Sequence, residues 1–459
     1  MSNKLKEYFN SIKGVSQITF NPNGPGSVRI HLIPPKKIKM GIAWVVIING
    51  QDVLPLTTGW AILLREFINN AICYDGIEID DETIKKVIND TTNRMLEIFP
   101  KTKKEIFKSD LRDIVDTLVK IAKGETPPVR IGYMSLNKYA KYMRAPHRMD
   151  LMISSMYKEG RWNCNQKCLH CYAGEQVEAQ TKEISTNDWK KIIDKCKEAM
   201  IPQLTFTGGE PTLRSDLVEL VDYSSWFVTR LNTNGVLLTK KLCRELKEAS
   251  LDSVQITLYS FDENIHNELV GANNYQATVE GIKNAIEEGL NVSINTPLCK
   301  LNENYKKTIM FARNLGVIYF SCSGMIMTGN SQYESALETY LTKKEITEIV
   351  EDATKYCYKN KLEISFTSPG WISDDKLKEL KLVIPSCGAC LSNMAVAPNG
   401  DVIPCQSWLN GEVLGNLLTD SFSSVWNNRK CKNIRKQSVN QEHICLLASG
   451  KETKDEKND

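Results

Sequence analysis

The sequence of 459 residues has no long apolar run, little net charge and few histidines. No stretch of about 18 apolar residues occurs, which excludes an integral membrane protein. The amino terminus has no apolar core followed by a small-residue cleavage site, so we expect a cytoplasmic protein without a secretory signal. The net charge of +3 gives no sign of a nucleic-acid or membrane partner. The five histidines are too scattered to indicate a general base.

Cysteine, by contrast, is abundant, with 14 residues. A reducing cytoplasm does not maintain disulfides, whereas thiolates at short spacings bind metals or iron–sulfur clusters. A first group is formed by Cys164, Cys168 and Cys171, and a second by Cys387, Cys390 and Cys405, with Cys431 and Cys445 after it. The remaining cysteines lie singly and are predicted to be small buried hydrophobes: Cys73, Cys196, Cys243, Cys299, Cys322 and Cys357.

Residues 1–105 are predicted to form a small α+β domain of the winged-helix type. The pair Asn49-Gly50 between apolar runs is typical of a hairpin, because both central positions of a type I′ turn favour positive φ. Strands are expected over 27–33, 43–50 and 51–57, and helices over 57–70 and 80–99. Residues 106–148, interrupted by "GETPP", are predicted to be a helical linker.

Residues 149–360 alternate between short apolar runs and helical stretches. Strands are predicted over 151–156, 203–207, 226–233, 253–259, 292–297 and 317–322. Strand and helix repeated in this way predict an α/β fold, a parallel sheet whose right-handed crossovers let it coil toward a barrel. Chemistry in such a sheet collects at the carboxyl ends of the strands. The first cysteine group and "TGGEPT" both follow predicted strands.

The first cysteine group offers three thiols where most cysteine sites use four. A structural zinc site is nearly always closed by four protein ligands, so the zinc alternative needs His170 as the fourth. A residue next to a ligand on so short a loop usually points the wrong way. The other interpretation is a [4Fe-4S] cluster on three thiolates, which leaves one iron open for a small molecule.

The spacing C-x3-C-x2-C resembles the signature of the radical S-adenosylmethionine (radical SAM) superfamily. In that family the open iron chelates SAM, whose reductive cleavage gives a 5′-deoxyadenosyl radical that takes hydrogen from a substrate. The resemblance implies a partial (β/α)6 barrel. It also implies that the GGEP motif contacts the SAM amino group, because glycines admit close backbone approach and a glutamate pairs with an ammonium. The implied SAM-binding residues are Gly208, Gly209, Glu210, Pro211, His170, Asn234 and Ser260.

His170 would lie beside the adenine and Asn234 near the ribose or carboxylate. Where the family often has Ser-x-Asp, this chain has Tyr259 and Ser260, which weakens the assignment of Ser260.

The second cysteine group, read as C-x9-G-x4-C around a predicted hairpin, resembles the SPASM or twitch extension of radical SAM enzymes. A structural zinc knot is the alternative. The extension implies auxiliary [4Fe-4S] clusters in a domain over 361–448, before a disordered tail at 449–459. Its later cysteine array is incomplete here, so one auxiliary cluster is expected. The implied ligands are Cys387, Cys390, Cys405 and Cys445, with Cys431 as the spare thiol.

Known members of the SPASM and twitch group largely modify peptides or proteins. The amino-terminal module resembles the peptide-recognition domain of maturases that act on ribosomally made precursor peptides, in which the leader adds a strand to a sheet edge. The resemblance therefore implies a precursor-peptide partner, and an electron donor such as flavodoxin or ferredoxin. The expected product is a thioether crosslink.

Several alternatives stay open. The first is a peptide epimerase, in which Cys322 at the end of the sixth predicted strand returns a hydrogen atom to the α-carbon. Others are oxidation of a side chain in a peptide or protein, action on a small metabolite, and a non-enzymatic iron–sulfur sensor. The amino-terminal module has an unrelated winged-helix or dimerisation domain as its alternative.

Overall fold

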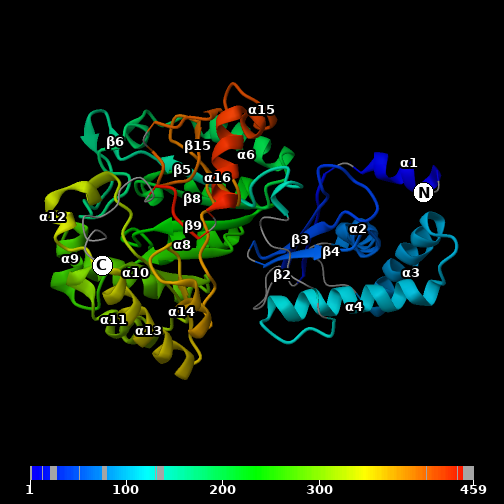
Figure 1. Ribbon diagram of the computed structural model, residues 1–459, viewed down its shortest axis with the longest axis horizontal. Coiled ribbons are helices and arrows are strands. Elements are labelled where there is room, and N and C mark those ends of the chain that lie inside the picture. The colour runs from blue at the N-terminus through cyan, green and yellow to red at the C-terminus, as the bar shows by residue number, and fades with distance from the viewer. Residues whose placement is uncertain are drawn as a thin grey trace. The chain divides into compact units, whose positions relative to one another are not determined.

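The computed structural model describes residues 3–12, 14–20, 28–50, 52–74, 80–129, 131, 139–409, 411–441 and 443–447. The chain forms two compact units, Met1–Ala145 with Glu198–Pro202 and Pro146–Lys197 with Gln203–Asp459. Figure 1 labels the elements of each unit. Within the described ranges, no helix is long and apolar enough to cross a membrane. The predicted tail at 449–459 lies outside the described residues.

The first unit contains a four-stranded antiparallel sheet with the strand order β1-β2-β3-β4. The turn between β3 and β4 contains Asn49 and Gly50, both with positive φ (50° and 69°), as the sequence predicted. The elements are α1 (Asn3–Ser11), β1 (Ser16–Phe20), β2 (Val28–Ile33), β3 (Trp44–Ile48), β4 (Asp52–Leu56), α2 (Thr58–Ala71), η1 (Ile72–Tyr74), α3 (Asp81–Ile98) and α4 (Lys104–Ala122).

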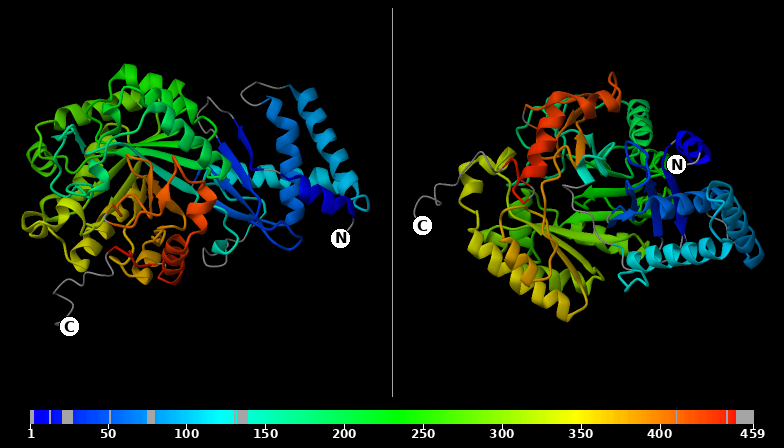
Figure 2. Two further views of the ribbon diagram at one scale, coloured as in Figure 1. Left: turned by 90° about the horizontal axis from the view of Figure 1, so that it is seen from above. Right: turned by 45° about the vertical axis from the view of Figure 1, so that its right-hand side comes forward.

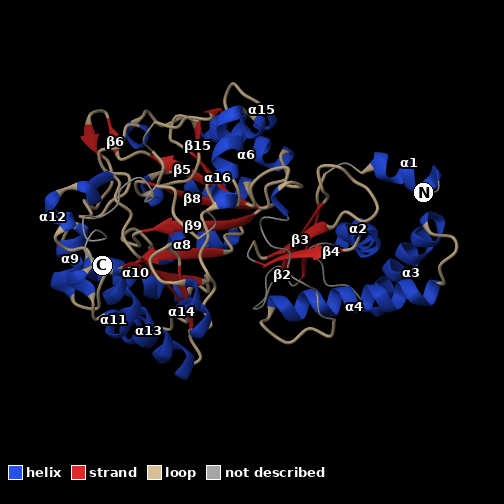
Figure 3. Cartoon of the chain, viewed as in Figure 1, coloured by secondary structure: helices blue, strands red, loops and turns tan. Residues whose placement is uncertain are grey.

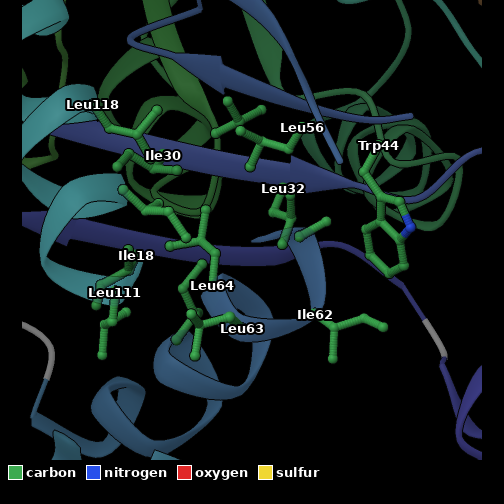
Figure 4. Close-up of a cluster of buried hydrophobic side chains, with 14 of the residues drawn as sticks. Ile18, Ile30, Leu32, Trp44, Leu56, Ile62, Leu63, Leu64, Leu111 and Leu118 are labelled. Atoms are coloured by element: carbon green, nitrogen blue, oxygen red, sulfur yellow. The ribbon is translucent and has the colours of Figure 1, made fainter. Parts of the chain in front are cut away.

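The core of this unit lies between one face of the sheet and the helices. Figure 4 shows Ile30 and Leu32 of β2 facing Leu64 of α2 and Leu118 of α4. Helix α4 was predicted as a linker. Its side chains instead belong to this core, because Phe107, Leu111, Ile114 and Leu118 repeat at helical spacing and are all buried. The linker prediction is therefore wrong for α4.

The second unit is built on a ten-stranded sheet with the order β13-β12-β11-β10-β9-β8-β5-β14-β15-β16. The seven strands from β13 to β5 run parallel, in agreement with the expected α/β barrel sheet. In both views of Figure 2 the helices of this unit lie around the outside of the strands. Figure 3 shows the same arrangement, with helices in blue and strands in red.

The bounds of these elements follow the predicted alternation. The strands are β5 (Arg148–Ser154), β6 (Tyr157–Lys158), β7 (Arg161–Trp162), β8 (Gln203–Gly208), β9 (Val228–Thr233), β10 (Ser253–Thr257), β11 (Val292–Pro297), β12 (Tyr319–Ser323), β13 (Glu363–Phe366), β14 (Asn393–Val396), β15 (Asp401–Ile403) and β16 (Gly415–Asn416). The α-helices are α6 (Thr186–Glu198), α7 (Leu217–Tyr223), α8 (Lys240–Glu248), α9 (Glu263–Val270), α10 (Tyr275–Glu287), α11 (Tyr305–Asn314), α12 (Glu334–Leu337), α13 (Lys343–Lys359), α14 (Asp374–Glu379), α15 (Phe422–Asn427) and α16 (Arg429–Asn440). Short 3-10 helices are η2 (Glu178–Gln180), η3 (Pro211–Leu213), η4 (Lys300–Asn302) and η5 (Gly329–Gln332).

Two strand pairings join the predicted second and third domains into one sheet. Strand β13, placed by the sequence in the carboxyl-terminal domain, pairs in parallel with β12 as a further barrel strand. Strand β14 pairs in parallel with β5, with Ala395 opposite Asp150. The predicted hairpin around Asn399 and Gly400 is present as β14 and β15. Backbone hydrogen bonds therefore hold the second cysteine group against the first strand of the barrel.

Candidate functional site

The first cysteine group lies in the loop after β7, at the carboxyl end of β5. The loop is anchored to the end of α9, because Lys167 N and Leu169 N donate to Val270 O and Leu269 O at 2.8 and 2.9 Å. These two backbone amides flank Cys168 and therefore hold the loop on both sides of its second cysteine. The position agrees with the rule that parallel sheets carry their chemistry at the carboxyl ends of strands.

Helix η5 holds the other side of the same loop. Asn330 donates through its backbone N to Cys171 O at 2.9 Å and through Nδ2 to Cys168 O at 3.1 Å. Gly329 has a φ of +60°, and a Cβ there would lie 2.4 Å from Cys171 O. Only glycine fits so close to the loop backbone. The cysteine loop is therefore clamped between α9 and η5.

The three thiols of this loop are half-buried and lie within electrostatic reach of one another. Burial, and then the charge of Glu210, raises the pKa of Cys164 to about 12. Burial also raises the pKa of Cys168, with the neighbouring thiols Cys171 and Cys164 adding to it. Without a metal these thiols are protonated at neutral pH, and bound cationic iron would deprotonate them. Among the described residues, no three His, Cys, Asp or Glu side chains converge on a single metal-ion position.

Glu210, at the carboxyl end of β8, is 1 % exposed and is the most heavily bonded group of the site. Its Oε1 accepts from Thr212 N, Thr212 Oγ1 and Thr233 Oγ1 at 3.0, 2.6 and 2.6 Å. Its Oε2 accepts from Asn234 N at 2.8 Å. Burial raises the pKa of Glu210, and these hydrogen bonds work against that rise by stabilising the carboxylate. Oε2, with one donor, keeps acceptor capacity for a cationic ligand.

The two glycines before Glu210 allow β8 to end close to β5. Gly208 has a φ of +139°, and a Cβ there would lie 2.2 Å from Ser154 O. A Cβ on Gly209 would lie 3.0 Å from Ser155 O. Any larger residue at Gly208 would push the two strand ends apart. Pro211 then begins η3, at a position that proline favours.

Asn234, at the end of β9, ties the GGEP region to the cysteine loop. Its Nδ2 donates to Asn165 Oδ1 at 2.6 Å, while its backbone N donates to Glu210. Ser260 is also buried, but its Oγ accepts from Asp262 N at 3.0 Å in the turn before α9. This bond gives Ser260 a local structural role, and a SAM contact of Ser260 stays a prediction.

His170 is held in an aromatic surrounding. Its Nε2 lies 2.8 Å from Thr339 Oγ1, and its ring centre lies 6.4 and 6.5 Å from those of Tyr259 and Tyr340. Burial lowers the pKa of His170 to about 4, so the ring is neutral at neutral pH. A neutral ring in such a surrounding suits stacking against a planar base.

The second cysteine group gathers from four separate segments. Cys387 and Cys390 precede β14, Cys405 follows β15, Cys431 lies in the first turn of α16, and Cys445 lies beyond α16. Cys390 N donates to Pro404 O at 3.1 Å, which fixes the first pair beside the third cysteine. The charges of Cys445 and Cys387 both act on Cys405. The five thiols therefore lie in one region of this unit, although no three of them converge on a single metal-ion position among the described residues.

Cys431 lies directly against Cys390, so it is not remote from the group. A hydrogen bond from the Cys390 thiol lowers the pKa of Cys431 and raises that of Cys390, and the positive charge of Arg435 lowers both. Both Cys431 and Cys445 lie beside other thiols of the group, so the assignment of Cys445 as a ligand and Cys431 as the spare thiol stays a prediction.

Two family models match the regions just described. The radical SAM superfamily model matches residues 163–315, and an iron–sulfur cluster-binding SPASM domain model matches residues 387–447. The chain belongs to the radical SAM superfamily and carries a SPASM domain. The first match begins one residue before Cys164, and the second covers all five thiols of the second group. The protein is accordingly a radical SAM enzyme.

Relatives and solved structures match beyond these regions. The chain is 27 % identical over 285 residues to the PqqA peptide cyclase of Bradyrhizobium diazoefficiens, covering 59 % of this chain and 72 % of that protein. It is 30 % identical over 192 residues to the AdoMet-dependent heme synthase of Oleidesulfovibrio alaskensis, covering 41 % of this chain and 49 % of that protein. The crystal structure of Streptococcus suis SuiB bound to precursor peptide SuiA superposes with a TM-score of 0.62 at 15 % identity, covering 95 % of this chain and 97 % of SuiB.

The radical SAM site contains buried polar atoms that would form hydrogen bonds with a ligand. His170 Nδ1 and Asn165 Nδ2 are buried nitrogen atoms without a hydrogen-bond partner among the described residues. Buried polar atoms are normally paired, so both fit a polar ligand between the cysteine loop and the GGEP region. Together with the acceptor capacity of Glu210, they fit SAM, which carries an ammonium, a carboxylate and an adenine.

The position of Cys322 does not support its predicted role as a hydrogen donor in the barrel. Side chains alternate across a strand, and Ser321 Oγ donates to Asn295 Oδ1 at 2.9 Å on the polar face of the sheet. Cys322 therefore lies on the opposite face, fully buried beside Tyr305 of α11 and Cys357 of α13. This position agrees with the alternative prediction of a buried structural cysteine, and the sequence does not show which face of β12 a residue occupies.

Two residues of the site were not recognised from the sequence. Asn165 was missed because a cysteine motif gives no sign that an intervening asparagine bonds to Asn234. Tyr172 packs against a buried cluster that includes Ala395 and Ile403, and it lies close enough to Cys171 and Cys405 for both to raise its pKa after burial. Tyr172 therefore connects the two cysteine groups, a relation that only the β5–β14 pairing creates.

Proposed function

We propose that this chain is a maturase that forms a thioether crosslink in a ribosomally synthesised precursor peptide. The single observation that carries the proposal is the combination of two units in one chain: a radical SAM and SPASM unit, and an α+β unit with a four-stranded sheet. The fold likeness to SuiB extends over both units, and SuiB has been crystallised with a precursor peptide. The PqqA peptide cyclase likeness supports the same class of substrate.

The first unit would hold the leader of the precursor. Strands β1 and β4 are the edges of its antiparallel sheet in the described part of the chain. An extended leader added to a sheet edge gains main-chain hydrogen bonds, which require few particular side chains in the leader. A leader held in this way raises the effective concentration of the core peptide at the active site.

In the second unit, Cys164, Cys168 and Cys171 would ligate a [4Fe-4S] cluster, with the SAM-binding residues being Gly208, Gly209, Glu210, Pro211, His170, Asn234 and Ser260. When bound, cluster and SAM supply a 5′-deoxyadenosyl radical that removes a hydrogen atom from the peptide. Glu210 would hold the SAM ammonium by a charge-assisted hydrogen bond. The clamped cysteine loop and the buried, hydrogen-bonded strand ends would fix the position of SAM and exclude water.

The product balance defines what the SPASM region must do. A C–H bond and an S–H bond of the peptide are lost and a C–S bond forms. One hydrogen atom leaves with 5′-deoxyadenosine, the thiol proton goes to solvent, and one electron is released. An auxiliary [4Fe-4S] cluster on the second cysteine group would accept this electron. A flavodoxin or ferredoxin would supply the electron that starts each cycle.

The test begins with a search of the neighbouring reading frames for a short candidate peptide, which is then expressed anaerobically together with this chain and analysed by mass spectrometry. The proposal predicts a loss of two daltons per crosslink and blockage of one cysteine to alkylation. A precursor lacking its leader is the matched control and should stay largely unmodified. Deuterium uptake from heavy water without net mass change in ordinary water would show epimerisation instead. An unchanged peptide together with steady 5′-deoxyadenosine release would contradict the peptide substrate.

A further inference from the structure

Cys431 lies at the positive end of a helix. Helix α16 spans 12 residues and begins after Asn428, whose side chain accepts from Cys431 N at 2.7 Å. Cys431 is therefore in the first turn, where the unpaired peptide N–H groups favour an anion. Its side chain is fully buried and faces Cys390.

Arg435 lies one helical turn after Cys431 and is held in place by three contacts. Its Nη1 lies 3.8 Å from Cys431 Sγ, its Nη2 donates to Trp426 O at 3.0 Å, and its guanidinium lies 3.7 Å from the centre of the Trp426 ring. The ring of Trp426 stacks in turn on Phe422 of α15, with 6.2 Å between centres. The guanidinium is thus oriented at the thiols by packing.

The charge of Arg435 has no anionic partner in the described part of the chain. No carboxylate there lies within ion-pair distance of Arg435, although arginine side chains that are partly buried usually have one. Its partners are an aromatic ring, a carbonyl oxygen and a sulfur atom. A guanidinium stays charged at any working pH. The arrangement is therefore incomplete without negative charge at the sulfur, which a thiolate bound to iron supplies.

We propose that Cys431 is an iron ligand of the auxiliary cluster and that Arg435 is a positioning residue that raises the reduction potential of this cluster. The inference rests on the proposed function only in requiring an auxiliary cluster. Reduction adds one electron and no bond changes. A fixed positive charge and a hydrogen bond to a ligand sulfur both stabilise the more negative, reduced state. A higher potential suits a cluster that accepts an electron from a substrate radical.

The test uses the full chain carrying Cys164→Ala, Cys168→Ala and Cys171→Ala, so that the remaining iron belongs to the SPASM region. After anaerobic reconstitution, iron content, electron paramagnetic resonance and a redox titration are measured without any peptide. Arg435→Gln is compared with Arg435→Lys. The matched control is Arg429→Gln, an exposed arginine at the first position of the same helix.

Arg435→Gln should lower the reduced-to-oxidised ratio at a fixed potential by roughly tenfold, which for a one-electron couple is a shift of about 59 mV. Arg435→Lys should recover part of the shift, because it keeps the charge but not the planar fork. Arg429→Gln should change the ratio less than about twofold, because screening weakens an exposed charge. Thermal midpoints show whether each variant folds. If Arg435→Gln does not fold, Arg435→Lys is judged against wild type on the same scale, with a smaller downward shift expected.

An iron-loaded Arg435→Gln variant with unchanged potential and spectrum would overturn the inference. Full iron loading and an unchanged spectrum in Cys431→Ser would overturn it too, particularly if Cys445→Ser loses iron. Neither result bears on whether a peptide is crosslinked. Conversely, a shifted potential in a protein that modifies no peptide would contradict the proposed function and leave this inference standing. A SPASM region that binds no iron would contradict both.

Discussion

Replacing Glu210 by glutamine tests the SAM site most selectively, because it changes one atom of the side chain. The glutamine oxygen can take over the donors Thr212 and Thr233, but its NH2 group then faces Asn234 N, which donates to Glu210 at 2.8 Å. One buried N–H loses its acceptor, and the SAM ammonium loses its anionic partner. The fold of the site is otherwise retained.

The expected loss of SAM affinity follows from the charge of the Glu210 carboxylate. A hydrogen bond to a charged group contributes about 1.5–3 kcal/mol, compared with about 0.5–1.5 kcal/mol for a neutral pair. Losing the charged contact to SAM should therefore raise the dissociation constant of SAM about 10- to 100-fold, at about 1.4 kcal/mol for each tenfold change. Iron content should stay at the wild-type level, because Glu210 is not among the expected iron ligands, which are all cysteines.

The assay is equilibrium binding of SAM to the anaerobically reconstituted protein, with the yield of 5′-deoxyadenosine after reduction as a second measurement. Glu219→Gln is the matched control, since Glu219 is 56 % exposed on α7 and pairs with Lys190 at the surface. It should bind SAM as wild type does. Equal SAM affinity in Glu210→Gln and wild type would refute the assignment of Glu210.

Three further predictions follow from single side chains. Gly208→Ala should destabilise the protein by about 2 kcal/mol or more, since its Cβ would meet Ser154 O at 2.2 Å. The control Gly59→Ala in α2, with open space around it, should instead raise the thermal midpoint, and equal midpoints in the two variants would contradict the prediction. Burial lowers the pKa of His266 to about 4, so the unfolded chain binds more protons than the folded chain below about pH 6.5. Stability should therefore fall by about 1.4 kcal/mol per pH unit between about pH 6.5 and 4. His266→Gln should lose less of its thermal midpoint on acidification, and a slope equal to that of wild type would contradict this prediction. Cys322→Ala should lower stability by about 1 kcal/mol yet leave 5′-deoxyadenosine formation within about twofold of wild type. Loss of that activity in a folded variant would contradict the position of Cys322 outside the active-site cavity.

The parts of the fold that the sequence predicted are those with a local signal. The alternation of strand and helix from β5 to β12, the Asn49-Gly50 turn and the cysteine spacing each depend on neighbouring residues. Strand β1 was missed although β3 and β4 are equally short, because no Asn-Gly pair directly follows it to mark a hairpin, as one does after β3. Helix α4 was taken for a linker although Phe107 and Leu111 begin a readable apolar stripe.

The parts of the site that the sequence did not predict depend on long-range pairing. The parallel pairing of β14 with β5 decides that Cys405 lies near Tyr172 and Asp150, and no local pattern in 387–405 contains that information. The face on which Cys322 lies follows from the register of β12. Likewise, the contact of Cys431 with Cys390 needs the packing of α16 against the hairpin.

The central claim is that three thiolates hold an iron–sulfur cluster whose open iron binds and cleaves SAM. The most direct measurement is the 5′-deoxyadenosine formed per chain after anaerobic reduction of single Cys164→Ala, Cys168→Ala and Cys171→Ala variants, with Cys196→Ala on α6 as the matched control. The account predicts that each of the three variants loses iron and forms at least about 100-fold less product, while the control retains both. Continued SAM cleavage in any of the three, or zinc in place of iron in that loop, would contradict it.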